Sequence, residues 1–218
     1  MTRPPLEGVT ALVFDFDGTL AELNIDFPAL YVRIFELADR FGVDRSRVSE
    51  GYLIELIDEM TAQLPDGRAA DFYSAATRLV VDEEVASAGR ASLFNGTRAL
   101  LAGLRKRKIA VGLVTRNCEA AVKTVFPDVE DLVDAFVPRE RTLRVKPDPL
   151  HLAGTLSLLT VSPARAAMVG DHPIDIVSAI KAGMIPVGVT TGKISREELI
   201  SAGAVLVLAR ASELEDYL

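Results

Sequence analysis

Short, nearly continuous apolar runs recur along the chain, and the later ones are separated by apolar residues at helical spacing. The apolar runs are Thr10–Phe14, Ile109–Thr115, Ala166–Gly170, Ile185–Thr190 and Ala204–Leu208. Runs of this length without alternation are typical of strands that are buried on both faces, as in a parallel sheet. Such strands alternating with helices predict an α/β fold with a doubly wound, mostly parallel sheet.

The interval from about residue 21 to residue 93 departs from this alternation, because it contains helical patterns and no convincing strand. The apolar stripes are Leu30, Ile34, Leu37 and Phe41; then Val48, Tyr52, Leu56 and Met60; then Ala69, Tyr73, Ala76 and Val80. A crossover between parallel strands needs only about a dozen residues, and this interval is several times longer. We therefore predict an α/β core of residues 1–20 and 94–218, with an inserted α-helical subdomain of residues 21–93.

Composition and charge narrow the possible partners. Hydrophobic residues make up 49% of the chain and charged residues 25%, as in soluble proteins with a full core. The net charge is −7, whereas surfaces that bind nucleic acid usually carry an excess of Lys and Arg. The sequence has one cysteine and no apolar run near the ~20 residues of a membrane span. Its first residues are without the long apolar stretch of a secretory signal, so we expect no such signal. We expect a cytoplasmic protein that binds neither nucleic acid nor membranes.

Polar side chains follow the predicted strands at the points where the strands end. Asp15 and Asp17 follow the first strand, Thr115 ends the second, and Asp171 follows the third, while Lys146 lies between the last two. Ligands of open α/β sheets bind beyond the carboxyl ends of the strands, so we expect these groups to converge there. Crowded carboxylates repel one another unless a cation lies among them, and oxygen ligands suit Mg²⁺. A magnesium ion and a lysine would together offset the charge of a phosphoryl group.

The same segments resemble the motifs of a known family. DFDGTL at Asp15–Leu20, Thr115 after its apolar strand, Lys146 within VKPDP, and GDHPID at Gly170–Asp175 stand in that order along the chain. They are similar to the motifs of the haloacid dehalogenase-like phosphohydrolase superfamily, in its phosphatase branch. The resemblance covers essentially the whole chain, and the helical insertion lies where that family places its C1 cap.

The resemblance implies a mechanism that uses the acidic residues. Asp15 would be the nucleophile that forms an aspartyl-phosphate intermediate. Asp17 would protonate the leaving alcohol and later activate water. Mg²⁺ would be held by Asp15, Asp171 and the backbone carbonyl of Asp17, with Asp175 as a supporting carboxylate.

The resemblance also implies that Thr115 and Lys146 bind the phosphoryl oxygens. The chain departs from the family pattern after Thr115, because Arg116 stands before Asn117 where Asn usually follows directly. We interpret Arg116 as an additional anion contact near the phosphate. A second departure is His172–Pro173 within the fourth motif, where small polar residues are more usual.

The predicted function is that of a magnesium-dependent phosphatase acting on a small phosphate ester. The length of the insertion resembles that of phosphoglycolate phosphatase-like enzymes, which favours a small phosphorylated metabolite. A phosphomutase of the β-phosphoglucomutase type keeps the same motifs and stays an alternative. A haloacid dehalogenase proper is disfavoured by Asp17, and a phospho-receiver module by the length of the chain and its helical insertion.

Overall fold

The computed structural model describes residues 6–218 and divides the chain into two compact units. Residues up to Leu23 form the α/β unit together with Ala88–Leu218, and Asn24–Ser87 form the helical unit. The chain therefore leaves the α/β unit once and returns to it once. The predicted domain limits, at 20/21 and 93/94, fall close to these two crossings.

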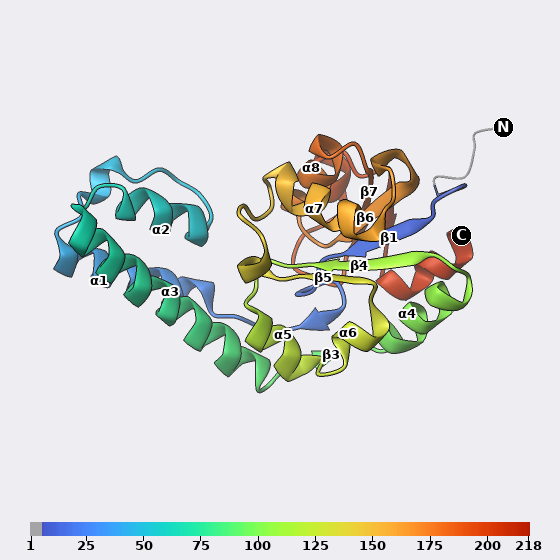
Figure 1. Cartoon of the computed structure of the whole chain (residues 1–218), viewed down its shortest axis with the longest axis horizontal. Coiled ribbons are helices and arrows are strands. Elements are labelled where there is room, and N and C mark those ends of the chain that lie inside the picture. Colours follow the sequence, from blue (N-terminus) through green and yellow to red (C-terminus); the bar gives the residue numbers. More distant parts are fainter. Residues whose placement is uncertain (1–5) are drawn as a thin grey trace. The chain divides into compact units, whose positions relative to one another are not determined.

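A six-stranded sheet with the order β5-β4-β1-β6-β7-β8 forms the centre of the α/β unit (Figure 1). Its strands are β1 (Ala11–Phe14), β4 (Ala110–Val114), β5 (Ala135–Val137), β6 (Ala166–Gly170), β7 (Ile185–Val189) and β8 (Leu206–Leu208). Every neighbouring pair is parallel. The chain builds outward from β1 first on one side and then on the other, so the sheet is doubly wound. The predicted fold class is confirmed.

Helices cover both faces of this sheet, as Figure 1 shows. They are α4 (Thr97–Lys106), α5 (Glu119–Val125), α6 (Val129–Leu132), α7 (Pro149–Leu159), α8 (Pro173–Lys181) and α9 (Arg196–Ser201), with 3₁₀ turns at Arg139–Arg141, Pro163–Arg165 and Ala211–Tyr217. Leu152 of α7 and Ala179 of α8 pack with Val13 and Met168 of the central strands. This buried layer holds the ends of β1 and β6 in place beside each other.

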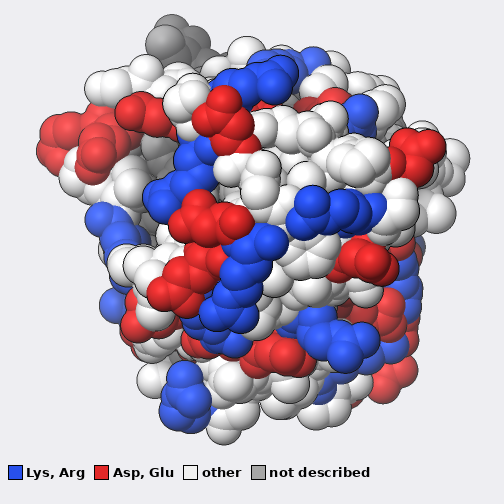
Figure 2. All heavy atoms as spheres, turned by 90° about the vertical axis from the view of Figure 1, so that its left-hand side faces the viewer, with Lys and Arg blue, Asp and Glu red and all other residues white. Residues whose placement is uncertain are grey.

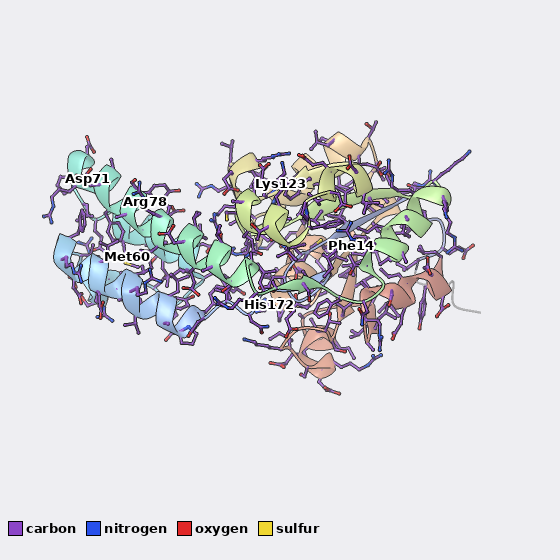
Figure 3. All side chains as sticks on the ribbon, turned by 90° about the horizontal axis from the view of Figure 1, so that it is seen from below. Phe14, Met60, Asp71, Arg78, Lys123 and His172 are labelled. Carbon is purple, nitrogen blue, oxygen red and sulfur yellow. The ribbon has the colours of Figure 1, made fainter. Side chains whose placement is uncertain are left out.

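The helical unit consists of α1 (Phe27–Phe41), α2 (Leu53–Thr61) and α3 (Asp66–Ala88), with a 3₁₀ turn at Arg45–Arg47. Asp26 caps α1 by accepting a hydrogen bond from the Ala29 N–H, and Gly42 ends the helix in the left-handed region at φ 77°. The three helices share a separate apolar core. Met60, labelled in Figure 3, belongs to it and is fully buried.

The third predicted stripe of this unit is partly wrong. Tyr73 is 45% exposed, and the buried face of α3 is formed by Phe72, Ala76 and Val80 instead. Ala76 and Val80 are buried as predicted, and Phe72, one turn before Ala76, takes the buried position that the pattern gave to Tyr73. Val48 and Tyr52 also lie before α2, which begins at Leu53.

Two further strands correct the prediction that the inserted interval contains none. β2 (Ala21–Glu22) and β3 (Ser92–Leu93) form an antiparallel pair in which Ala21 faces Leu93. β5, at the edge of the main sheet, is likewise absent from the predicted strands. β2 and β3 have only two residues and β5 has three, and none of them lies within a longer apolar run that would produce a recognisable pattern.

The distribution of surface charge and the lengths of the helices are relevant to the prediction that the protein binds neither nucleic acid nor membranes. On the face drawn in Figure 2, basic and acidic side chains are interspersed rather than gathered by sign. None of the helices in the described part of the chain combines the length and apolar character needed to cross a membrane.

Candidate active site

The turn after β1 positions the first two aspartates. All four residues of β1 are buried, and the Asp15 N–H donates to the Val169 carbonyl of β6 at 2.9 Å, so Asp15 is held at the strand end. Gly18 then adopts φ 81°, a left-handed conformation that glycine allows at little cost. The reversed chain returns the Asp17 carboxylate to the Leu23 N–H, which donates to it at 2.9 Å.

A buried ammonium group connects two carboxylates at this edge of the sheet. Lys146 Nζ lies 2.6 Å from Asp15 Oδ1 and 2.6 Å from Asp175 Oδ1. The Lys146 side chain is 1% exposed and that of Asp175 is inaccessible, whereas Asp15 retains 13% exposure. Burial lowers the pKa of Lys146, but the two carboxylates outweigh burial and raise it, so the lysine is charged. Asp15 is therefore the member of this group that solvent or a substrate can reach.

Asp171, directly after β6, completes a cluster of carboxylates. Asp15, Asp171 and Asp175 each offer an oxygen atom within 4.8 Å of the others. Thr19 Oγ1 donates to Asp171 Oδ1 at 3.3 Å. Burial and the neighbouring carboxylates raise the pKa of Asp171 to about 8. Burial likewise raises the pKa of Asp15 to about 6, although Lys146 lowers it.

This donor set fits a hard divalent cation. Its oxygen ligands carry more negative charge than Lys146 alone neutralises, and a cation among them would remove the repulsion. The site residues Asp15, Asp171 and Asp175 therefore suit the predicted magnesium ion.

Asp17 lies outside that cluster, so its carboxylate is not one of the grouped oxygen ligands. Burial raises the pKa of Asp17 to about 6, with the charge of Asp15 adding to the shift and the Leu23 N–H opposing it. A carboxyl group with a pKa near neutrality can both give and take a proton under ordinary conditions. The backbone carbonyl of Asp17 stays the predicted metal ligand at this position.

Thr115 follows β4, the strand that pairs with β1 on the side away from β6. Its hydroxyl donates to Asn117 Oδ1 at 2.9 Å and accepts the Asn117 N–H at 3.1 Å. The Arg116 guanidinium donates to the backbone carbonyl of Lys146. Arg116 thus reaches the segment that presents Lys146, while phosphate contacts by Thr115, Arg116 and Lys146 stay predictions.

His151 holds the backbone of Lys146 in place through hydrogen bonds. The Lys146 N–H donates to His151 Nδ1 at 3.3 Å, so this nitrogen carries no proton and Nε2–H donates to the Val137 carbonyl at 2.9 Å. Burial, and then the charge of Lys146, lower the pKa of His151 to about 4. His151 is therefore neutral and fixes the backbone that carries the lysine.

His172 caps α8, which explains its place in the fourth motif. His172 Nδ1 accepts the Ile174 N–H at 3.2 Å, and the His172 N–H donates to Asp175 Oδ2 at 3.2 Å. This capping box leaves Asp175 Oδ1 directed at Lys146. Figure 3 labels His172 and also Phe14, the last residue of β1.

The loop after β7 is a part of the site that no sequence motif indicates. Thr191 Oγ1 donates to the Gly18 carbonyl at 2.5 Å, and Gly192 lies against the Asp171 carboxylate. Only the position of this loop could have indicated its role, because it follows a strand that ends at the same edge of the sheet as β1 and β6.

The comparison with known families decides which family the chain represents. A family model described as haloacid dehalogenase-like hydrolase matches residues 12–189. The chain belongs to this family. Asp15, Lys146 and Asp171 all lie inside the matched range.

Individual relatives of this haloacid dehalogenase-like hydrolase are phosphatases by description. A phosphoglycolate phosphatase from Rhodospirillum rubrum is 31% identical over 95% of this chain and 90% of the relative. A validoxylamine A 7′-phosphate phosphatase from Streptomyces hygroscopicus subsp. limoneus is 28% identical over 82% and 84%. Membership of the family, in its phosphatase branch, confirms the prediction that the chain is an enzyme of this kind.

A solved structure shows the same fold. A haloacid dehalogenase-like hydrolase from Bacteroides fragilis superposes with a TM-score of 0.72 at 21% identity, covering 94% of this chain and 99% of the other. At this level of identity the likeness concerns the fold alone.

Proposed function

We propose that this hydrolase is a magnesium-dependent phosphatase that cleaves a small phosphate monoester through an aspartyl-phosphate on Asp15. The observation that carries the proposal is the Lys146 ammonium 2.6 Å from Asp15, within a cluster of carboxylates suited to a divalent cation. Such a site can neutralise a phosphoryl group next to an accessible carboxylate oxygen, and neutralisation with positioning is most of what phosphoryl transfer requires.

In the first step an Asp15 oxygen attacks phosphorus and the ester P–O bond breaks. Asp17 gives its proton to the departing alkoxide, so the alcohol leaves neutral. In the second step Asp17 takes a proton from water as the water oxygen attacks phosphorus. The Asp15–phosphorus bond breaks, and inorganic phosphate is released with Asp15 restored.

Asp15, Asp171 and the Asp17 carbonyl would hold the magnesium ion, with Asp175 supporting them through Lys146. When bound, the ion offsets the charge of the phosphoryl oxygens. Lys146 and Thr115 would contact the remaining phosphoryl oxygens, and Arg116 would add an anion contact beside them. His151 and Asp175 would hold Lys146 in the direction this requires.

The substrate we propose is a small phosphorylated metabolite such as phosphoglycolate. The R. rubrum relative supports this choice through its name and its identity over nearly the whole chain. We further propose that the helical unit is the cap implied by the resemblance and that its residues select the leaving group. The single buried cysteine, Cys118, fits a cytoplasmic setting.

The test is phosphate release from a panel of small phosphate esters, with Mg²⁺ or with a chelator. We expect metal-dependent release by the wild type and a loss of at least 10³-fold in Asp15→Asn, since the nucleophile is gone. Asp17→Asn should also lose most activity, whereas Asp216→Asn, at an exposed position of the same unit, should behave as wild type. Wild-type turnover by Asp15→Asn would contradict the mechanism. Phosphoryl return to a sugar phosphate without release would favour the mutase.

A further inference from the structure

Asp171 lies between two glycines that come from distant parts of the chain. A Cβ placed on Gly18 would overlap the Asp171 carboxylate, and so would a Cβ placed on Gly192. At Gly192 the Cβ would also come within 3.0 Å of Asp171 Cβ. We call this arrangement the glycine slot: Gly18 and Gly192, with the Asp171 carboxylate between them.

The two glycines are required for different reasons. Gly18 has φ 81°, so its backbone already favours glycine. Gly192 lies outside the left-handed region, but the atoms nearest to a Cβ there all belong to Asp171 and would overlap it. Glycine is therefore required at position 192 by the close approach of the β7–α9 loop to Asp171, and not by the backbone conformation of the loop.

Thr191 connects the two walls of the slot. Its hydroxyl donates to the Gly18 carbonyl at 2.5 Å across 173 positions of sequence. The hydrogen bond joins the β7–α9 loop to the turn that carries Asp17 and Thr19. Thr19 in turn donates to Asp171 Oδ1, so both walls and the carboxylate form one connected network.

The slot constrains a carboxylate that lies among others. Asp171 offers an oxygen atom within 4.8 Å of oxygens of Asp15 and Asp175, and carboxylates this close repel one another when they are ionised. Two backbone walls and one hydroxyl donor leave the carboxylate little space to rotate. Ligands that are held in place before the cation arrives bind it more tightly than ligands that must be ordered.

We propose that Thr191 and Gly192 are positioning residues that set the divalent-cation affinity of the site by holding Asp171 and the Asp17–Thr19 turn. The inference rests on the proposed function, because it assigns these residues to the same cation site. It adds the β7–α9 loop to the parts of the chain that build the site.

The test measures cation binding directly, by calorimetry with Mg²⁺ and by electron paramagnetic resonance with Mn²⁺, in the full chain. We expect Gly192→Ala to weaken binding at least tenfold, the loss typical when a partner of a metal ligand is disturbed. Gly154→Ala is the matched control, because a Cβ there meets no atom within 4 Å, and it should bind as wild type. Equal affinities in Gly192→Ala and Gly154→Ala would overturn the inference.

A second pair of variants keeps the test decisive if Gly192→Ala does not fold. Thr191→Val removes the hydrogen bond at nearly constant volume and should weaken cation binding, whereas Thr191→Ser should restore it. We also expect Thr191→Val to lower kcat with little change in KM for the ester. Wild-type affinity in Thr191→Val would contradict the role of Thr191. If the affinity differences hold but wild type hydrolyses no ester, the proposed function fails and the positioning role stands.

Discussion

At the scale of single residues, Lys146 is a buried charge held between two carboxylates. Removing the ammonium leaves Asp15 and Asp175 without their shared cation in a buried site. Breaking a buried ion pair in this way is strongly destabilising. We expect Lys146→Met to lower the free energy of unfolding of the metal-free protein by about 3 kcal/mol.

Urea denaturation measures this loss. The control is Lys181→Met, an exposed lysine in the last turn of α8, which should change stability by less than about 0.5 kcal/mol. Equal stabilities of the two variants would mean that the ion pairs contribute nothing to folding.

His151 gives the protein a predictable sensitivity to acid. Its folded pKa of about 4 lies below the ordinary value of 6.5, so the unfolded chain binds the proton first as the pH falls. The stability that neutral His151 contributes is complete above pH 6.5 and is lost progressively toward pH 4. Between pH 7 and pH 5 the loss from this residue is about 2 kcal/mol.

Unfolding measured at both pH values should therefore show a smaller acid loss in His151→Gln than in wild type. Nitrogen NMR provides an independent measurement, because the chain has only two histidines and His172→Gln identifies the second signal. A neutral ring protonated at Nε2 at pH 6 is expected. A His151 ring that titrates near pH 6.5 would contradict the buried hydrogen bonds.

Residue by residue, the sequence located the polar groups but not the contacts among them. Asp15, Asp17 and Asp171 follow strands, and a strand end is visible as a break in an apolar run. The pairing of Lys146 with Asp15 depends on a loop path and on His151, which no local pattern encodes. Gly192 has no functional side chain that a sequence motif could indicate. The need for glycine at this position is apparent only from the space that the Asp171 carboxylate occupies.

At the scale of elements, the sheet and α7 meet at a glycine. Gly112 of β4 faces α7, and a Cβ there would come within 2.9 Å of Thr155 Cγ2 and 3.2 Å of Val13 Cγ2. Both neighbours are branched residues held by their own element, so relaxation is costly. We expect Gly112→Ala to lower the free energy of unfolding by about 1–3 kcal/mol through overpacking.

Gly154→Ala, on α7 in open space, is the control and should be neutral or stabilising by up to about 1 kcal/mol. Wild-type stability of Gly112→Ala would mean that α7 can shift on the sheet. The example also shows which elements sequence can predict. Long buried strands and helices produce clear patterns, whereas the tight contact at Gly112 and the two-residue strands β2 and β3 do not.

At the scale of the whole molecule, the short β2–β3 pair marks where the two units separate. Ala21 faces Leu93, and Glu22 faces Ser92 across the antiparallel ladder. The Leu20 carbonyl also accepts the Phe94 N–H at 2.9 Å and the Thr97 hydroxyl at 2.9 Å, which ties the pair to α4. The two crossings of the chain are therefore held next to each other by residues of the α/β unit.

This geometry predicts that the helical unit can be replaced by a tight turn. An Asn-Gly dipeptide between Glu22 and Ser92 would close a two-residue hairpin on an existing strand pair. Because the helical unit has a core of its own, the remaining α/β unit should keep its sheet, measured by circular dichroism, and its Mg²⁺ affinity. The shortened protein should lose most of its preference among esters, if the helical unit selects the leaving group. Unfolding or loss of cation binding would show that the deleted residues 23–91 are needed to build the site, and an unchanged preference would place specificity in the α/β unit.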